Sequence, residues 1–270
     1  MRNTYLNILI TYKFFHFGKT CQFSQYLLLV VIFILSAFNS AYSQQTNIHI
    51  SLPPIIDCEY EAGHENKEVS ASYISMSGEM LDLNGIDVNV IFREAISNTT
   101  ASNFTLGLAI LYGNMDIDIF ERSTGLYIAH GSYNREYQVI KRPVSRLTLF
   151  WGLPLSLGDF VIENGEVVKM RTLVTGIQGG AQLGLKTGNF MSSPFVMVNL
   201  LGGIMERYDG GVFYENLDSG GIPSFASITY GLKIIYIPYN ITLSGIIQKT
   251  FESGDNKPIN TTIIQLSWSF

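Results

Sequence analysis

The last ten residues of the chain, "TTIIQLSWSF" from Thr261 to Phe270, decide the fold class because apolar and polar residues alternate along them. One face of an extended strand would carry Ile264, Leu266, Trp268 and Phe270, and the other would carry Gln265, Ser267 and Ser269. Chain ends are usually polar and frayed. An aromatic residue at the very end of an alternating strand therefore predicts that this strand faces a membrane.

The same alternation recurs in four upstream segments, at 147–157, 173–185, 225–236 and 241–250. Each runs for roughly ten residues or more, whereas soluble strands usually have about five or six. The face opposite the apolar one is made mainly of Gly, Ser, Thr and Gln and carries little charge. Long strands with an apolar face and a small polar face predict an all-β fold, a transmembrane antiparallel β-barrel. Only a closed barrel of strands pairs every backbone group in lipid.

The first third of the chain adds four candidate strands, at 69–80, 87–94, 104–112 and 115–131. With six later strands the expected total is ten, and eight or twelve stay open. The barrel is expected to cover 67–270. Residues 44–66 are expected to form a periplasmic extension, a plug or a tether, and the sequence leaves open whether they enter the barrel.

Links between the strands alternate in length. We expect the links at 158–169, 208–223 and 254–260 outside the cell, and the short turns around Ser192 and Pro238 in the periplasm, because outer-membrane barrels have short periplasmic turns.

An apolar run at Tyr26–Phe38 follows three basic residues and precedes "NSAYS", which predicts a signal peptide at 1–43. Cleavage removes three of the 17 basic residues and no acid, so 14 bases remain against 22 acids, a net charge of −8. An acidic chain without a basic cluster argues against nucleic acid as a partner. One cysteine, Cys58, remains and forms no intramolecular disulfide alone.

Together these features resemble bacterial outer-membrane β-barrel proteins, and the Asn- and Ile-rich composition suggests a Bacteroidota-type source, with no narrower family identified. The resemblance implies residence in outer-membrane lipid and insertion by the barrel-assembly machinery, with Leu266, Trp268 and Phe270 as the assembly signal. It also implies a structural, partner-docking or narrow, porin-like role rather than an enzymatic one. A secreted soluble β-sandwich is the other fold that alternating strands allow.

Candidate chemistry is sparse. His130 and Ser132, with Glu136 nearby, resemble the His-x-Ser pair of outer-membrane lipid A deacylases, in which histidine activates serine. The alternative function is therefore a lipid-modifying hydrolase, although we expect this pair beside a periplasmic turn, and the pair would have to point outward near the outer leaflet.

Other candidates are possible binding residues. Asp116 and Asp118 share one strand face and suit a cation. Phe213 and Tyr214 lie in the 208–223 link, where they suit an envelope or extracellular partner such as a surface glycan. The glycines at 176, 180 and 184 are expected to leave space that large side chains fill. The sequence contains no metal-binding cluster and no cofactor motif.

Overall fold

The computed structural model describes residues 50, 52, 62–79, 81–117, 120–164, 166–209, 212–216, 224–252 and 258–270, and the expected signal peptide at 1–43 lies outside them. The elements are β1 (Glu65–Ser77), β2 (Leu81–Ala95), β3 (Thr100–Ile117), β4 (Phe120–Lys141), β5 (Ser145–Asn164), β6 (Glu166–Thr187), β7 (Phe190–Asp209), β8 (Val212–Asn216), β9 (Ser224–Tyr236), a 3-10 turn η1 (Ile237–Tyr239), β10 (Ile241–Glu252) and β11 (Ile259–Ser269). Among the described residues, no helix is long and apolar enough to cross a membrane.

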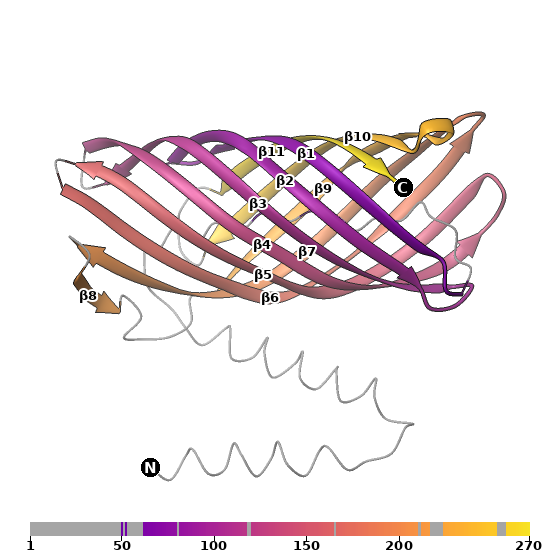
Figure 1. Cartoon of the computed structure of the whole chain (residues 1–270), viewed down its shortest axis with the longest axis horizontal. Coiled ribbons are helices and arrows are strands. Elements are labelled where there is room, and N and C mark those ends of the chain that lie inside the picture. Colours follow the sequence, from indigo (N-terminus) through magenta and orange to yellow (C-terminus); the bar gives the residue numbers. More distant parts are fainter. Residues whose placement is uncertain are drawn as a thin grey trace, which may run out of the picture. The chain divides into compact units, whose positions relative to one another are not determined.

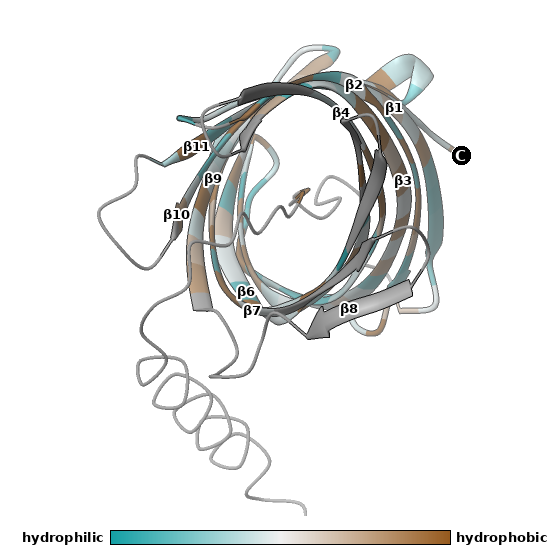
Figure 2. Ribbon diagram, turned by 90° about the vertical axis from the view of Figure 1, so that its left-hand side faces the viewer, coloured by the Kyte–Doolittle hydropathy of each residue, from teal (hydrophilic) through white to brown (hydrophobic). Residues whose placement is uncertain are grey.

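Ten of these strands form one closed antiparallel barrel, which Figures 1 and 2 show from the side and from one end. Neighbours in sequence pair around the ring, and β7 continues to β9. The ring closes where β1 pairs with β11, from Glu68 opposite Ser269 to Ser77 opposite Asn260. Within the described chain, β8 pairs only with the end of β7. The predicted ten-stranded barrel is confirmed, and the two-sheet sandwich is wrong because the sheet returns to its own first strand.

The two ends of the barrel differ. The terminal end holds Glu65 and Phe270 together with the links at 96–99, 142–144, 188–189 and 237–240. The loop end holds the links at 78–80, 118–119, 165, 210–223 and 253–258. Gly188 and Asn240 in the terminal-end turns have φ values of 59° and 52°, the left-handed conformation that tight turns favour in Gly and Asn. The turns at Pro238 and next to Ser192 therefore share the end that holds both ends of the barrel chain, as predicted.

The outer face of the barrel is apolar. Alternate residues of β11 show the pattern, since Trp268 is 57% exposed whereas Gln265 and Ser267 are buried in the interior. Leu149, Trp151 and Leu153 of β5 are also exposed. A monomeric soluble protein does not expose such a continuous apolar surface, so this face is built for lipid.

Two groups of exposed aromatic residues border this apolar face. The group at the terminal end contains Phe92, Phe104, Tyr137, Phe190, Tyr239, Trp268 and Phe270, and the group toward the loop end contains Tyr73, Tyr112, Tyr127, Tyr230 and Phe251. On β3, the eight residue-to-residue steps from Phe104 to Tyr112 extend ~26 Å along the strand, and a strand tilt of about 40° reduces this to ~20 Å of height. That height is close to the roughly 25 Å apolar band of outer-membrane barrels.

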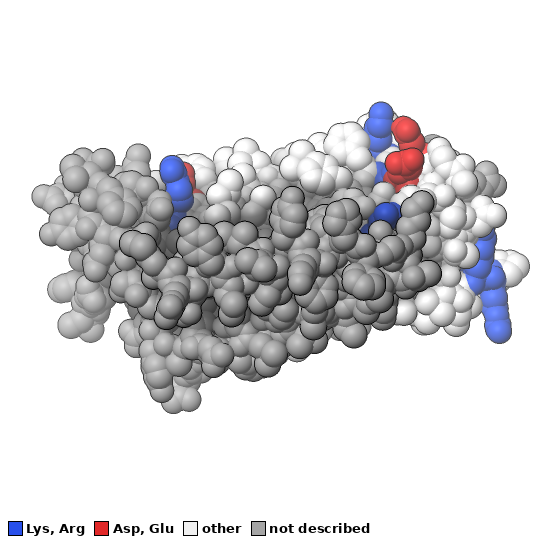
Figure 3. All heavy atoms as spheres, turned by 90° about the horizontal axis from the view of Figure 1, so that it is seen from below, with Lys and Arg blue, Asp and Glu red and all other residues white. Residues whose placement is uncertain are grey.

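Several strands continue beyond the apolar band at the loop end. Asp159 of β5 lies opposite Tyr127 of β4 and forms an exposed ion pair with Arg171 of β6, with Arg171 Nε 2.9 Å from Asp159 Oδ1. Figure 3 shows described charged side chains near the two ends of the face it presents, with uncharged side chains between them. Beyond Asp159 the pairing of β5 with β6 continues to Asn164 opposite Glu166. The wall therefore extends past the lipid-facing surface into water.

Two expected boundaries are wrong, because the hydropathy pattern marks neither of them. The segment 158–169 is not a long loop, because β5 and β6 continue through it and leave residue 165 as the link. The candidate strand at 115–131 contains the link at 118–119 and is divided between β3 and β4. Strand pairing in water needs no apolar face, and alternation can continue across a two-residue turn, so hydropathy marks neither boundary. β1 also begins at Glu65, two residues before the expected barrel boundary.

Candidate functional site in the barrel lumen

The inward face of the wall is divided into a polar region and an apolar region. Inward residues toward the loop end form one apolar cluster: Ile74, Met76, Leu81, Leu83, Ala109, Leu111, Met115, Leu126, Ile128, Phe195, Ile246, Ile259 and Ile263. Inward residues nearer the terminal end on β2, β3, β4 and β6 include Asp87, Asn89, Arg93, Asn103, His130, Asn134, Glu136 and Gln178, all buried. These polar residues are the candidate site, because buried polar and charged groups in a membrane barrel require partners.

Asp87 is the acceptor of the first polar group. His130 Nε2 of β4 lies 2.9 Å from Asp87 Oδ1 of β2, and Asn89 Nδ2 donates to Asp87 Oδ2. The strand between them, β3, places Gly107 there, and a Cβ on Gly107 would lie 2.0 Å from Asn89 Oδ1 and 2.5 Å from His130 Nε2. Because Gly107 has no side chain, His130 of β4 can reach across β3 to Asp87 of β2.

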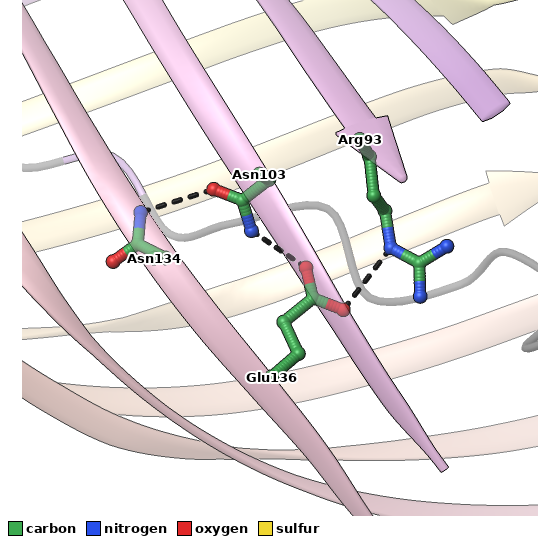
Figure 4. Close-up of polar contacts among 4 residues, drawn as sticks. All are labelled: Arg93, Asn103, Asn134 and Glu136. Carbon is green, nitrogen blue, oxygen red and sulfur yellow. Dashed lines mark hydrogen bonds and ion pairs between the residues drawn. The ribbon is translucent and has the colours of Figure 1, made fainter. Parts of the chain in front are cut away.

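Glu136 is the centre of the second polar group, of which Figure 4 shows Arg93, Asn103, Asn134 and Glu136. Arg93 Nε lies 3.1 Å from Glu136 Oε2, and Asn103 Nδ2 donates to Glu136 Oε1 at 2.6 Å. Asn134 Nδ2 donates to Asn103 Oδ1 at 3.0 Å, and Gln178 Nε2 of β6 donates to Asn134 Oδ1. The group thus connects β2, β3, β4 and β6 across the lumen wall.

A second glycine makes this connection possible. Gly152 of β5 lies between Asn134 and Gln178 in register, and its Cβ would lie 2.2 Å from Asn134 Oδ1. Because β5 has no side chain at that position, Gln178 reaches Asn134 over it. Both polar groups therefore depend on one glycine in the intervening strand.

The ionisable side chains in these groups are almost completely withdrawn from solvent. The side chains of Arg93 and Glu136 are both 0% exposed, and those of His130 and Asp87 are 4% and 0% exposed. Removing one partner of such a pair is strongly destabilising because the other charge stays buried. Loss of Glu136 alone would therefore leave the Arg93 charge buried in the lumen wall.

The structure does not join His130 and Ser132 as a catalytic pair. His130 Nε2 bonds to Asp87, whereas Ser132 Oγ accepts a hydrogen bond from Asn134 Nδ2 at 2.9 Å. The expected place beside a periplasmic turn is wrong, since His130 lies within β4 opposite Gly107 and Ser156, both inside their strands. His130 also points into the lumen rather than outward, because β4 alternates and its even positions face the interior.

The predicted binding residues that the structure describes lie toward the loop end. Asp116 lies near the end of β3 opposite Glu121, and Asp118 lies outside the described residues. Phe213 and Tyr214 belong to β8, where Phe213 lies opposite Tyr208 of β7. Among the described residues, no group of three or more His, Cys, Asp or Glu side chains is arranged to hold a metal ion.

The predicted assembly-signal residues lie on the outer face at the barrel seam. Leu266, Trp268 and Phe270 are all exposed, and the rings of Trp268 and Phe270 lie 5.3 Å apart. The last residue is held in the sheet, since Phe270 N donates to Lys67 O at 2.9 Å and Lys67 N donates to Phe270 O at 3.1 Å. The chain therefore ends on a paired strand that closes the barrel.

Sequence reasoning missed the lumen networks. One signal was available on β2, where Asp87, Asn89 and Arg93 have the same parity and thus share one strand face. Charged residues in a strand that spans lipid must face the interior, and they require partners there. The partners themselves come from β3, β4 and β6 and depend on strand register, which the sequence alone does not supply.

No protein-family model matches the chain, and no curated protein matches it in sequence. Solved structures do match it. The outer membrane protease OmpT from Escherichia coli has a TM-score of 0.51 and 10% identity, covering 76% of this chain and 96% of that one. The translocator domain of the autotransporter NalP from Neisseria meningitidis has a TM-score of 0.45 and 11% identity, covering 77% and 89%. Neisserial surface protein A has a TM-score of 0.33 and 10% identity, covering 76% and 95%.

At these identities the likeness concerns the fold alone. The fold is that of bacterial outer-membrane barrels, and the apolar outer face between two groups of aromatic residues agrees with it. The chain is an integral β-barrel protein of the bacterial outer membrane.

Proposed function

We propose that the protein is a sealed, non-enzymatic outer-membrane barrel whose loop end serves as a docking platform for a partner outside the cell. The observation that carries the proposal is the combination of a packed lumen with a wall that continues past the lipid-facing surface. A packed lumen supports a barrel that is closed to solutes. A wall that protrudes beyond the lipid supports a surface on which a partner outside the cell can dock. A Bacteroidota-type source remains our expectation from composition.

Large inward side chains fill the lumen over glycines of the next strand. Phe150 of β5 packs with Met197 of β7, and a Cβ on Gly180 of the intervening β6 would lie 2.6 Å from the Phe150 ring. Phe195 of β7 lies over Gly231 of β9 in the same way, with its Cζ 2.9 Å from the position that a Cβ would take. Small barrels have packed interiors, and this packing supports a sealed resting state.

The orientation follows from the two ends. Outer-membrane barrels have short turns and both chain ends in the periplasm. The terminal end has links of two to four residues and holds both Glu65 and Phe270, so we assign it to the periplasm. The loop end, with the 210–223 link and the protruding parts of β5 and β6, then faces the exterior.

The docking element we propose is the end of β7 with β8 and the following link, residues 208–223. It carries Phe213 and Tyr214, whose aromatic rings suit the apolar faces of sugars, and a surface glycan is therefore the partner class we propose. Binding of the purified barrel to immobilised surface polysaccharide tests this. The variant Phe213→Ser/Tyr214→Ser should lose binding while keeping the heat-dependent gel mobility of a folded barrel, and unchanged binding would contradict the proposal.

We propose separately that the protein has no lipid A hydrolase activity. This proposal is supported by the hydrogen bonds of His130 and Ser132, which go to different partners. Cells expressing His130→Ala or Ser132→Ala should keep the lipid A acylation pattern of cells expressing the original chain. A change of acylation that depends on both residues would favour the hydrolase instead.

A further inference from the structure

Three basic side chains lie at the terminal-end mouth of the lumen, on neighbouring strands. Lys141 of β4 lies opposite Arg146 of β5 in register. Lys186 of β6 lies beside the turn that joins those two strands, because Lys186 N donates to Val144 O at 2.9 Å, and it lies opposite Met191, a buried inward residue of β7. Opposite residues of paired strands have Cβ atoms about 4.5–5.5 Å apart, and like charges in that position repel. Lys141 and Arg146 therefore cost stability unless an anion lies between them.

A β-bulge turns Lys141 toward the inner face. The even residues of β4 up to Gln138 point into the lumen, so strict alternation would place Lys141 on the lipid-facing side. The register shift between Gln138 and Ile140 leaves Val139 and Ile140 both exposed. It thereby pairs Lys141 with Arg146, which lies at an inward position of β5. Bulges are over-represented at barrel rims, where they re-aim a side chain, and this one brings a second cation to the same mouth.

Two buried polar side chains one position deeper in the lumen lack hydrogen-bond partners. Gln138 is 7% exposed and Thr148 is 0% exposed, and the two lie opposite each other on β4 and β5. Within the described residues, neither Nε2 nor Oε1 of Gln138 has a hydrogen-bond partner, and Thr148 Oγ1 has none either. Buried polar groups are nearly always paired, because an unpaired one keeps its full desolvation cost. An unpaired amide and hydroxyl next to a group of cations point to a ligand that accepts hydrogen bonds.

No carboxylate of the described chain neutralises the three cations. The side chains of Lys141, Arg146 and Lys186 form no ion pair there. The inward acid of β4, Glu136, is bonded to Arg93. The positive charge at this mouth is thus available to an anion from outside the chain, although the chain as a whole is acidic.

We propose that this mouth binds the phosphate group of a water-borne solute. Phosphate carries more than one negative charge near neutral pH and several acceptor oxygens, which suits two lysines and an arginine. The Gln138 amide and the Thr148 hydroxyl would donate to further oxygens or to a water bound with them. The exposed residues on the outer side of the same strand end, Val139 and Ile140, are apolar. The cations therefore face the water of the lumen mouth, and the ligand reaches them from the periplasm.

The site is separate from the docking element at 208–223, which lies at the other end of the barrel. Binding at the mouth also requires no passage through the packed lumen. The inference therefore stands or falls independently of the proposed glycan docking.

Isothermal titration calorimetry of the purified full chain, in non-ionic detergent and with inorganic phosphate as the probe, tests the proposal. Phosphate should bind, and Arg146→Gln should weaken the binding about tenfold or more, because hydrogen bonds to charged groups are the strong ones. Arg135→Gln is the matched control, since Arg135 lies at the same end but opposite Trp151 on the outer face. It should change the affinity by less than about twofold, because distant charges are screened at physiological salt.

Gln138→Leu separates a built site from general attraction to positive charge. It leaves every cation in place and should still weaken phosphate binding about fivefold or more. Without phosphate its unfolding free energy should not fall, because the amide it removes has no partner. Lys186→Gln changes an exposed side chain and keeps the test decisive if Arg146→Gln lacks the gel mobility of a folded barrel. Absence of phosphate binding, or unchanged affinity in Gln138→Leu, would overturn the proposal.

Native mass spectrometry distinguishes a solute from a lipid headgroup as the source of the phosphate. The original chain and Arg146→Gln, each transferred from detergent containing phosphatidylglycerol, should retain that lipid equally. Retention by the original chain that is lost in Arg146→Gln would assign the phosphate to a lipid and overturn the water-borne ligand.

Discussion

Replacement of Gly107 by alanine is expected to lower the free energy of unfolding by about 2–5 kcal/mol, although it adds only one methyl group. The added Cβ would lie 2.0 Å from Asn89 Oδ1 and 2.5 Å from His130 Nε2, well inside van der Waals contact. Either Asn89 and His130 must leave Asp87, or β3 must move away from the lumen. The prediction thus tests whether the hydrogen bonds of Asn89 and His130 to Asp87 require glycine at position 107.

The magnitude combines three contributions. Overpacking a close-packed interior costs about 1–3 kcal/mol. Loss of a hydrogen bond to the buried Asp87 carboxylate costs about 1.5–3 kcal/mol. Alanine restricts the unfolded chain more than glycine does, which offsets about 0.4–1 kcal/mol.

Gly245 of β10 provides the matched control. It is exposed on the outer face, and no heavy atom lies within 4 Å of the position its Cβ would take. Urea unfolding of the detergent-solubilised barrel, followed by tryptophan fluorescence, would compare Gly107→Ala with Gly245→Ala. Equal unfolding free energies, within about 0.5 kcal/mol, would refute the account of how β3 admits the network.

Three further outcomes are expected in the same unfolding assay. Glu136→Gln should cost about 3–5 kcal/mol because it leaves the Arg93 charge buried without its carboxylate, and a loss below 1 kcal/mol would show that the ion pair is not what holds the wall. Asp159→Asn should cost less than about 1 kcal/mol, since its ion pair with Arg171 is exposed to solvent. A larger loss would contradict the location of this pair in water beyond the lipid-facing band. Phe150→Ala should cost about 3–5 kcal/mol through the cavity it leaves in the lumen, and a neutral result would argue against a packed interior.

The strands and their faces could be predicted from the sequence wherever lipid imposes a pattern. Along the membrane-spanning parts of β11 and β5, outward residues are mostly apolar and inward ones mostly small or polar, so alternation reveals the face of Trp268 and of Leu153, although Phe150 and Ile263 are apolar and point inward. Where β5 and β6 extend into water around Asp159, that requirement ends. Charge and glycine then resemble a loop, and the sequence-based boundary at 158–169 failed there.

The lumen site was less accessible to prediction because it consists of relations between strands. Asp87 and His130 are 43 residues apart, and they meet only because β2, β3 and β4 pair in one particular register across Gly107. Ile50 and Leu52 form only a short apolar pattern in the sequence. Nothing in that pattern indicated that both side chains are buried in the lumen. Face assignment is a local property of the chain, whereas these contacts are not.

The most direct test of the central claim is the gel mobility of the protein extracted by detergent from the outer-membrane fraction, with and without boiling. A closed barrel whose ring is completed by β1 and β11 resists the detergent, so the unboiled protein should migrate faster than the boiled one. A protein released without detergent, with the same mobility before and after boiling, would contradict the closed transmembrane barrel.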